Sequence, residues 1–355
     1  MGAKAASVRY FVTGGAGFLG LAIVRALREA GHEIVTYSRG DYPELQELDI
    51  HHKRGDLGDL DRLIESSKNC DAVFHVAAKA GIWGPYGDYH RANVDGTLNV
   101  VHACRENEIS KLVYTSTPSV VFDGRGSEGK NESLPYATHF LAHYPKTKAI
   151  AEEAVLKNND ENLATVALRP HLIWGPRDHH FLPRLVDKAK KGKLRFLGEE
   201  QYSVDSIYVE NAARAHMLAM DCLEPGSSLA GRAYFLSQNE PIPISELINK
   251  ILHAAGLPPV TKRISPRLAY AAGTVLETLY STLGIEREPP MTRFLAKQLS
   301  TPHWYDVSAA EKDFGFRSEI SIEEGMKRLR NWILETNPFG ENQSIPPNRS
   351  PDQKG

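Results

Sequence analysis

Short hydrophobic runs alternate with longer segments of helical periodicity over the first half of the chain. The first run, at 10–12, is followed by a glycine-rich turn and by apolar residues at helical spacing from 18 to 27. The same rhythm predicts further strands at 33–37, 51–54, 72–75, 112–115 and 163–168. Alternating strands and helices with mostly apolar strands predict an α/β fold, a doubly wound parallel sheet between two layers of helices.

The second half of the chain is organised differently. From Gly175 onward, prolines divide the sequence into shorter segments. We therefore expect a first domain over 1–175, to which 206–240 returns, and a smaller, mostly helical lobe over 176–205 and 241–335. Residues 336–355 are rich in Pro, Asn, Ser and Gly without apolar periodicity, which is typical of a disordered tail.

Composition and charge narrow the class of protein. The 355 residues are 41% hydrophobic and 24% charged, which excludes wholesale disorder. Lys and Arg total 42 against 44 Asp and Glu, so charge gives no reason to expect nucleic acid as a partner. Three scattered cysteines and the lack of a basic, apolar leader predict a cytoplasmic protein without a disulfide framework. The histidine pairs at 51–52 and 179–180 lack further ligands at metal spacing, so we expect no metal site.

The glycine-rich turn after the first strand carries the first chemical signal. Glycines let a backbone approach a pyrophosphate closely, and the N-terminus of the following helix offers free N–H groups to the anion. Such a turn is weak evidence alone, but between a strand and a helix it predicts a Rossmann-type dinucleotide-binding domain. The residues expected at the cofactor are Gly14, Ala16, Gly17, Phe18, Leu19, Gly20 and, after the fourth strand, the small residues Ala77 and Ala78, although alanine is also ordinary core filler.

The ends of the second and third strands indicate which dinucleotide binds. An acidic residue after the second strand would accept the ribose hydroxyls of NAD, but this chain has Ser38 and Arg39, and a guanidinium suits the 2′-phosphate of NADP. We therefore predict NADP(H) ahead of NAD(H). The alternative is that Arg39 is a solvated loop residue, with Asp41 nearby. Asp56 follows the third strand and is expected at the adenine amino group, unless it only caps the next helix.

Tyr144 and Lys148 provide the sharpest catalytic signal. Four residues apart on a predicted helix, they share one face. A phenol with a pKa near ~10 is a poor acid–base catalyst at neutral pH unless a cation lowers that pKa. Chance alone gives roughly one such pair in a chain of this composition, so the pair gains weight from following the glycine-rich turn. Of the hydroxyls that end the fifth strand, we choose Thr117 to orient a substrate carbonyl, with Ser116 as the alternative.

With these residues in place, the sequence resembles the extended short-chain dehydrogenase/reductase family over residues 8–335. The resemblance implies hydride transfer with a nicotinamide dinucleotide, Tyr144 as the proton donor, Lys148 at the nicotinamide ribose and Thr117 at the substrate oxygen. It also implies that Asn93 supports a relay water near Lys148. Taken without the resemblance, Asn93 would be interpreted as a packing residue. The matching pieces are 13–20, 56–57, 92–97, Tyr144 with Lys148, and 168–170, and they place Leu57 and Pro170 at the cofactor.

Within that family, the segments 168–178 and 206–216 are similar to the 3β-hydroxysteroid dehydrogenase group. The segments 115–122 and 143–145 are similar to bacterial reductases of long-chain olefin biosynthesis, which reduce 2-alkyl-3-oxoalkanoic acids with NADPH. Nucleotide-sugar epimerases carry a Phe-Asn pair where this chain has His171 and Leu172, which argues against a nucleotide-sugar substrate.

These resemblances imply an NADP-dependent oxidoreductase that reduces the 3-oxo group of a bulky apolar substrate, first of all a 2-alkyl-3-oxoalkanoic acid. The alternatives are a 3β-hydroxysteroid or sterol-4α-carboxylate 3-dehydrogenase and, more remotely, a non-catalytic protein that senses NADP(H).

The segment 268–283 bears on the partners. It carries Leu, Ala, Val and Tyr at helical spacing. It would therefore either cover a lipid-binding pocket or make peripheral contact with a membrane surface. We favour a buried cap helix over the membrane contact. The stretch falls short of the ~20 apolar residues that a membrane span needs. Dimers through a helix pair are common in the family, so a homodimer stays open by analogy. Arg105 and Arg169 are expected to be surface charges.

Overall fold

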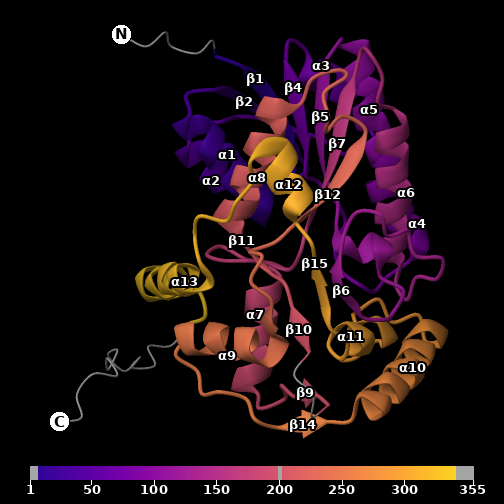
Figure 1. Ribbon diagram of the computed structural model, residues 1–355, viewed down its shortest axis with the longest axis vertical. Coiled ribbons are helices and arrows are strands. Elements are labelled where there is room, and N and C mark those ends of the chain that lie inside the picture. Colours follow the sequence, from indigo (N-terminus) through magenta and orange to yellow (C-terminus); the bar gives the residue numbers. More distant parts are fainter. Residues whose placement is uncertain (1–6, 199–201, 341–355) are drawn as a thin grey trace.

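Seven parallel strands form the main sheet of the computed structural model, which describes residues 7–198 and 202–340 (Figure 1). The strand order is β12-β7-β5-β4-β1-β2-β3. Each of the six strands predicted for the first half of the chain is present, and the doubly wound parallel sheet is confirmed. The bounds are β1 (Arg9–Thr13), β2 (Glu33–Ser38), β3 (His51–Arg54), β4 (Ala72–His75), β5 (Lys111–Thr115), β7 (Ala164–Pro170) and β12 (Arg232–Leu236).

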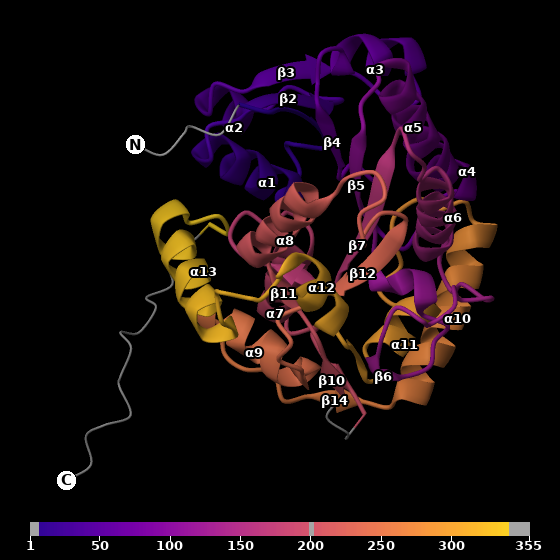
Figure 2. The same cartoon turned by 45° about the horizontal axis from the view of Figure 1, so that its top comes forward.

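Helices cover both faces of this sheet because its central strands are apolar on both sides (Figure 2). One core lies between the sheet and the helices α1 (Phe18–Glu29), α2 (Pro43–Glu47), α8 (Val209–Cys222) and α12 (Ser308–Phe314). A second core lies on the opposite face, under α3 (Leu60–Ser67), α5 (Gly96–Glu106) and α6 (His143–Lys157).

The order of the strands identifies the edge at which a ligand can bind. The chain runs outward from β1 first toward β3 and then, from β4, in the opposite direction, so the order reverses between β1 and β4. Open parallel sheets bind ligands at the carboxyl ends of their strands, beside such a reversal. In this molecule that edge faces the smaller half of the structure (Figure 1).

Within the described residues, the smaller half consists of short strands and five helices. One sheet has the order β13-β10-β15-β6, and β11 pairs with β8 and β14 with β9. The strands are β6 (Ser127–Lys130), β8 (Ile173–Trp174), β9 (Phe196–Leu197), β10 (Ser203–Val204), β11 (Ile207–Tyr208), β13 (Ile242–Pro243), β14 (Arg263–Ile264) and β15 (His303–Tyr305). The helices are α7 (Phe181–Lys190), α9 (Ile244–Ala254), α10 (Pro266–Thr282), α11 (Arg293–Gln298) and α13 (Ile322–Thr336). Strand β6 belongs to residues 1–175, the predicted first domain, but it pairs with β15 of the smaller half.

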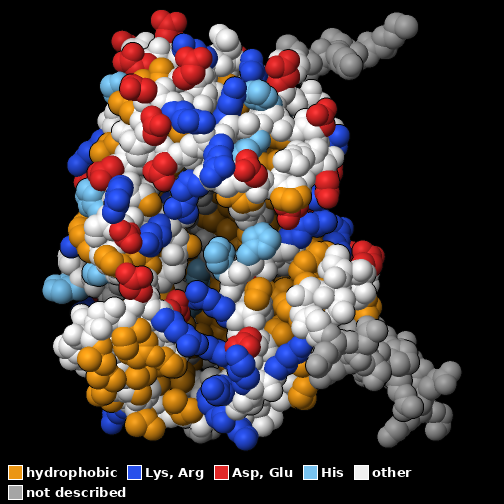
Figure 3. Space-filling view, turned by 180° about the vertical axis from the view of Figure 1, so that it is seen from behind, with side chains coloured by type: hydrophobic (Ala, Val, Ile, Leu, Met, Phe, Trp, Pro, Cys, Tyr) orange, Lys and Arg blue, Asp and Glu red, His pale blue; other side chains and the backbone are white. Residues whose placement is uncertain are grey.

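The helix α10 differs from the buried cap helix that we expected. A narrow strip that includes Gly273 packs on α11, where a Cβ on Gly273 would lie 2.7 Å from the backbone of Thr292. The opposite face exposes four large apolar side chains, and Figure 3 shows them as the hydrophobic patch at the lower left. They are Leu268, Val275, Leu279 and Leu283, which are 63%, 66%, 47% and 64% exposed. The expectation of a buried helix is wrong for this face, and contact with a membrane surface stays a prediction.

Two further expectations from the sequence concern a membrane span and the C-terminal tail. None of the described helices is long and apolar enough to cross a membrane. The last helix, α13, ends at Thr336. Most of the tail that the composition predicts to be disordered, 341–355, lies outside the described residues.

Candidate active site

The turn between β1 and α1 leaves no room for side chains. Gly14 has a φ of +68°, and a Cβ there would lie 2.8 Å from the Cα of Ala77. A Cβ on Gly20 would collide with the carbonyl of Gly14. Gly17 precedes α1 without a side-chain cap, and the first turn of α1 holds no acidic residue, so its N–H groups can face an anion. This cradle fits a dinucleotide pyrophosphate, and the other predicted members, Ala16, Phe18 and Leu19, lie in the same turn or at the start of α1.

The predicted determinants of the dinucleotide lie at the end of β2. The Oγ of Ser38 is buried without a hydrogen-bond partner among the described residues. Arg39 is exposed, and none of the described carboxylates pairs with its guanidinium. Asp41 instead pairs with Arg54, 3.2 Å away, and the Nε of Arg54 donates to the carbonyl of Arg39 at 2.8 Å. The neighbouring acid therefore does not neutralise Arg39.

The remaining cofactor candidates lie along the same edge of the sheet. Asp56 does not cap α3: its Oδ1 accepts from the N–H of Gly58 at 2.8 Å, and Asp59 provides the cap. Leu57 packs on the core beneath α3 and α5. Ala77 and Ala78 follow β4, and Pro170 is the last residue of β7.

Lys148 and Tyr144 lie one turn apart in α6, as the sequence predicts. Lys148 is 2% exposed, its Nζ donates to the carbonyl of Thr115 at 2.6 Å, and it lies 4.1 Å from the ring centroid of Tyr114. Burial lowers the pKa of Lys148 to about 7, and the carboxylate of Glu152 opposes that shift. Among the described residues, no carboxylate pairs directly with this ammonium group.

Thr117 meets Tyr144 at the end of β5. Thr117 precedes the 3₁₀ turn η2 (Pro118–Val121), its Oγ1 accepts from the N–H of Ser119 at 3.2 Å, and its hydroxyl lies close enough to Tyr144 to lower the pKa of that phenol. Burial raises the pKa of Tyr144 to about 12, and the nearby Thr117 hydroxyl acts in the opposite direction. Ser116, the alternative, is buried, and its Oγ has no partner among the described residues. The structure thus brings Thr117, Tyr144 and Lys148 together as one group.

Asn93 lies in a single π-helical turn, η1 (Arg91–Asp95), between α4 (Tyr86–His90) and α5. Its Oδ1 accepts from the N–H of Lys79 at 2.7 Å, and its Nδ2 donates to the Lys79 carbonyl at 3.2 Å and to Oγ1 of Thr147 at 3.0 Å. Asn93 therefore ties the segment after β4 to the residue before Lys148. Such π turns are frequent at functional sites. The relay water implied by the resemblance stays a prediction.

Arg169 is not the surface charge that we expected. It lies in β7, is 4% exposed, and its Nε lies 3.0 Å from Oε2 of Glu152, which is fully buried in α6. The hydroxyl of Tyr136 donates to the same carboxylate at 2.9 Å. The continuous apolar run just before Arg169 is the signal that the strand stays buried here. Arg105, by contrast, does lie at the surface, where it pairs with Asp160.

A pair of buried histidines at the junction of the two halves was not predicted. His171 directly follows β7, and its Nε2 lies 3.1 Å from Nδ1 of His303 in β15. The sequence marks His171 only as a departure from the sugar-nucleotide pattern. His303 carries no local signal, because 132 residues separate the two.

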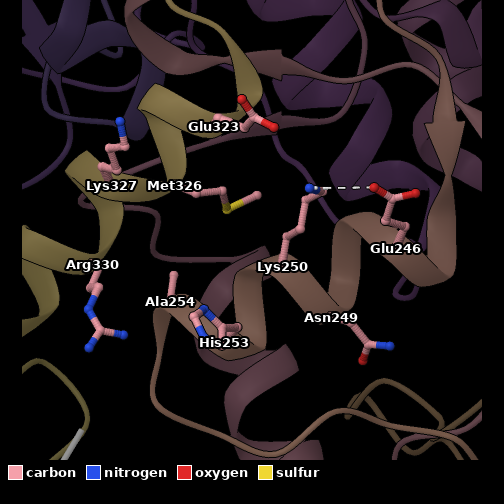
Figure 4. Close-up of a pocket in the computed structure, with 9 residues that line it drawn as sticks. All are labelled: Glu246, Asn249, Lys250, His253, Ala254, Glu323, Met326, Lys327 and Arg330. Atoms are coloured by element: carbon pink, nitrogen blue, oxygen red, sulfur yellow. Dashed lines mark ion pairs between the residues drawn. The ribbon is translucent and has the colours of Figure 1, made fainter. Parts of the chain in front are cut away.

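Figure 3 shows a hollow between the two halves, with hydrophobic side chains in its depth and Lys, Arg and His side chains around its rim. Two pockets include none of Thr117, Tyr144 and Lys148. One, of about 410 Å³, lies between α9 and α13, where Lys250 points toward Glu246 and pairs with it (Figure 4). The other, of about 440 Å³, lies between α1 and α8 and includes only Phe18 of the predicted site residues.

Comparisons with known proteins agree with this geometry. A sequence model of the 3-beta hydroxysteroid dehydrogenase/isomerase family matches residues 11–265. A 2-alkyl-3-oxoalkanoate reductase of Stenotrophomonas maltophilia is 50% identical over 91% of this chain and 98% of its own. A decarboxylating sterol-4-alpha-carboxylate 3-dehydrogenase of Mus musculus is 34% identical over 89% of this chain and 88% of its own. A solved UDP-glucose 4-epimerase from Thermotoga maritima, with UDP-glucose, matches with a TM-score of 0.73 over 93% of this chain and 100% of its own; at 19% identity it shows the fold alone.

Proposed function

Because this chain belongs to the 3-beta hydroxysteroid dehydrogenase/isomerase family and is an oxidoreductase, we propose that it reduces the 3-oxo group of a 2-alkyl-3-oxoalkanoic acid with NADPH. The observation that carries the proposal is the meeting of Thr117, Tyr144 and Lys148 at the carboxyl edge of the sheet, in a chain half identical to a reductase named for that substrate. Both relatives described above have names that place an acid group on a carbon next to C3.

The catalytic group performs the proton chemistry of this reduction. A bound nicotinamide dinucleotide supplies a hydride to the carbonyl carbon. Tyr144 is protonated at neutral pH, because burial raises its pKa, and it gives its proton to the developing alkoxide oxygen. Thr117 hydrogen-bonds that oxygen, so negative charge is stabilised where it forms. The ammonium of Lys148, one turn away, favours loss of the phenolic proton and faces the same edge.

The preference for NADP rests on Ser38 and Arg39. Because Arg39 has no acidic partner among the described residues, its guanidinium is free for a 2′-phosphate. Replacing Arg39 with Ala should raise the KM for NADPH about 10- to 100-fold, the value of one charged hydrogen bond, and leave the KM for NADH unchanged. Arg28→Ala, an exposed arginine on α1, is the matched control. An equal change for both cofactors would show that Arg39 does not select between them.

The substrate is tested by the choice between two alcohols. Reduction of NADP and of NAD is followed with a 2-alkyl-3-hydroxy fatty acid and with a 3β-hydroxysterol. Turnover of the fatty acid with NADP is the expected result. Turnover of the sterol with NAD, and none of the fatty acid, would overturn both parts of the proposal. It would favour the sterol dehydrogenase, which the 34% identical relative makes the second candidate.

A further inference from the structure

One buried histidine differs from the others in its hydrogen bonding. Both ring nitrogens of His75, His216 and His303 have partners. His171 is also buried, but its Nδ1 has no hydrogen-bond partner among the described residues. Buried polar atoms are nearly always paired, so an unpaired one calls for a water or a ligand.

The partners of the histidine pair determine where its protons lie. The Nε2 of His303 is 2.8 Å from the carbonyl of Gln298, which can only accept, so this nitrogen carries the hydrogen. The Nδ1 of His303 is then an acceptor, and the Nε2 of His171, 3.1 Å away, must donate to it. Neutral imidazole has one ring hydrogen. The Nδ1 of His171 is therefore a bare acceptor.

His171 lies at the edge that carries the catalytic group. The N–H of Ser116 donates to the carbonyl of Leu168 at 2.6 Å, so the chain segments that follow β5 and β7 leave the sheet side by side. Thr117 is the next residue on one segment, and His171 follows Pro170 on the other. The Oγ of Ser116 is a second unpaired buried polar atom at this edge.

The charged groups around His171 leave it neutral in the free protein. Burial, with His303 beside it, lowers its pKa well below the ordinary value. Tyr305, with its ring centroid 5.6 Å away, has its pKa raised by burial and is uncharged. Asp205 accepts from the N–H of Tyr305 at 3.2 Å, and burial raises its pKa to about 6. The guanidinium of Arg169, two residues earlier in the chain, is paired with Glu152.

We propose that His171 binds the carboxylate of the substrate, and that this carboxylate binds together with one proton shared between its oxygen and Nδ1. The inference rests on the proposed function, because such a substrate carries its acid group on the carbon next to the carbonyl. A carboxylate and a bare Nδ1 are both acceptors, so they can pair only through a proton taken from solvent. The number of protons taken up on binding is the same whether the proton is assigned to the carboxylate oxygen or to Nδ1. The hydrogen bond to His303 holds the imidazole ring of His171 in position to share this proton.

The first test compares a 2-alkyl-3-hydroxy acid with its methyl ester, oxidised with NADP. The His171→Phe variant should lose about 10- to 100-fold in kcat/KM for the acid, the value of one charged hydrogen bond, and little for the ester. His171→Asn keeps an amide N–H near the Nδ1 position and should recover part of the preference for the acid. Asp205→Asn, at the same junction, is the control and should leave the ratio of acid to ester unchanged.

Equal losses for acid and ester in His171→Phe would overturn the role of His171, because the residue would then only shape the pocket. A wild-type protein that oxidises neither compound would instead overturn the proposed function. The two failures are therefore distinguishable.

The second test measures the proton itself. The 2-alkyl-3-hydroxy acid is titrated calorimetrically into the NADPH-bound protein, a pair that cannot react, in buffers of different ionisation enthalpy at pH 8. The wild type should take up about one proton more on binding than His171→Asn does. The ester should show no such difference. Asp205 is ionised throughout at this pH, and Lys148 is common to both proteins, so the difference reports His171. Equal proton uptake in the two proteins would contradict the proposal.

Discussion

Two adjacent turns of α6 hold buried charges in opposite ways. On one turn, the carboxylate of Glu152 is satisfied by Arg169 and Tyr136. Four residues earlier, the ammonium of Lys148 has only a backbone carbonyl and an aromatic ring as partners among the described residues. The carboxylate of Glu152 thus has a counter-charge and a hydroxyl partner, whereas the ammonium of Lys148 has no counter-charge paired with it. A buried group with all its partners serves the fold, whereas one that lacks them is poised for a ligand.

The largest expected effect is on activity, at the turn of α6 that carries Tyr144 and Lys148. Tyr144→Phe removes the proposed proton donor but keeps the ring, so turnover should fall about 10²- to 10⁴-fold, the usual contribution of general acid catalysis. Cofactor binding, followed by fluorescence, and the unfolding midpoint should stay as in the wild type. Retained turnover would show that another group protonates the substrate.

A change at Glu152 should act on stability instead. Glu152→Gln leaves the buried guanidinium of Arg169 without its counter-charge, which costs about 3–5 kcal/mol for buried pairs. The adjacent Glu153→Gln is a matched control, because Glu153 forms an exposed pair with Lys157 worth at most about 1 kcal/mol. Urea unfolding of both variants measures the difference. Similar losses of unfolding free energy in the two variants would show that the buried pair stabilises the fold no more than the exposed pair.

The smallest effect is a dependence on pH. Because the pKa of Lys148 is lowered to about 7, its charge is present below pH 7 and lost above it. The kcat/KM for ketone reduction should therefore decline as the pH rises through about 7. Lys148→Arg stays charged and should lose this decline, whatever its absolute rate. A decline that persists in Lys148→Arg would assign it to a different group.

The strands and helices of the first half could be predicted because their signals are local. Each strand of the main sheet up to β7 lies where the sequence pattern places it, whereas β6, outside that sheet, was not predicted. The cap of α3 at Asp59 is a short-range effect. Tyr144 and Lys148 were predictable for the same reason, since four residues on one helix define a face. The sequence by itself thus determined the doubly wound sheet, the glycine cradle and the candidate proton donor.

The tertiary structure alone decided which charged and polar groups are buried and with what partners. Arg169 meets Glu152 because β7 packs against α6, and His171 meets His303 because β15 lies against the end of β7, across 132 residues of sequence. The exposure of α10 likewise depends on what the rest of the chain leaves uncovered. Such contacts join segments remote in the chain, so no local pattern contains them, and desolvation, which sets the pKa values of these groups, exists only in the folded state.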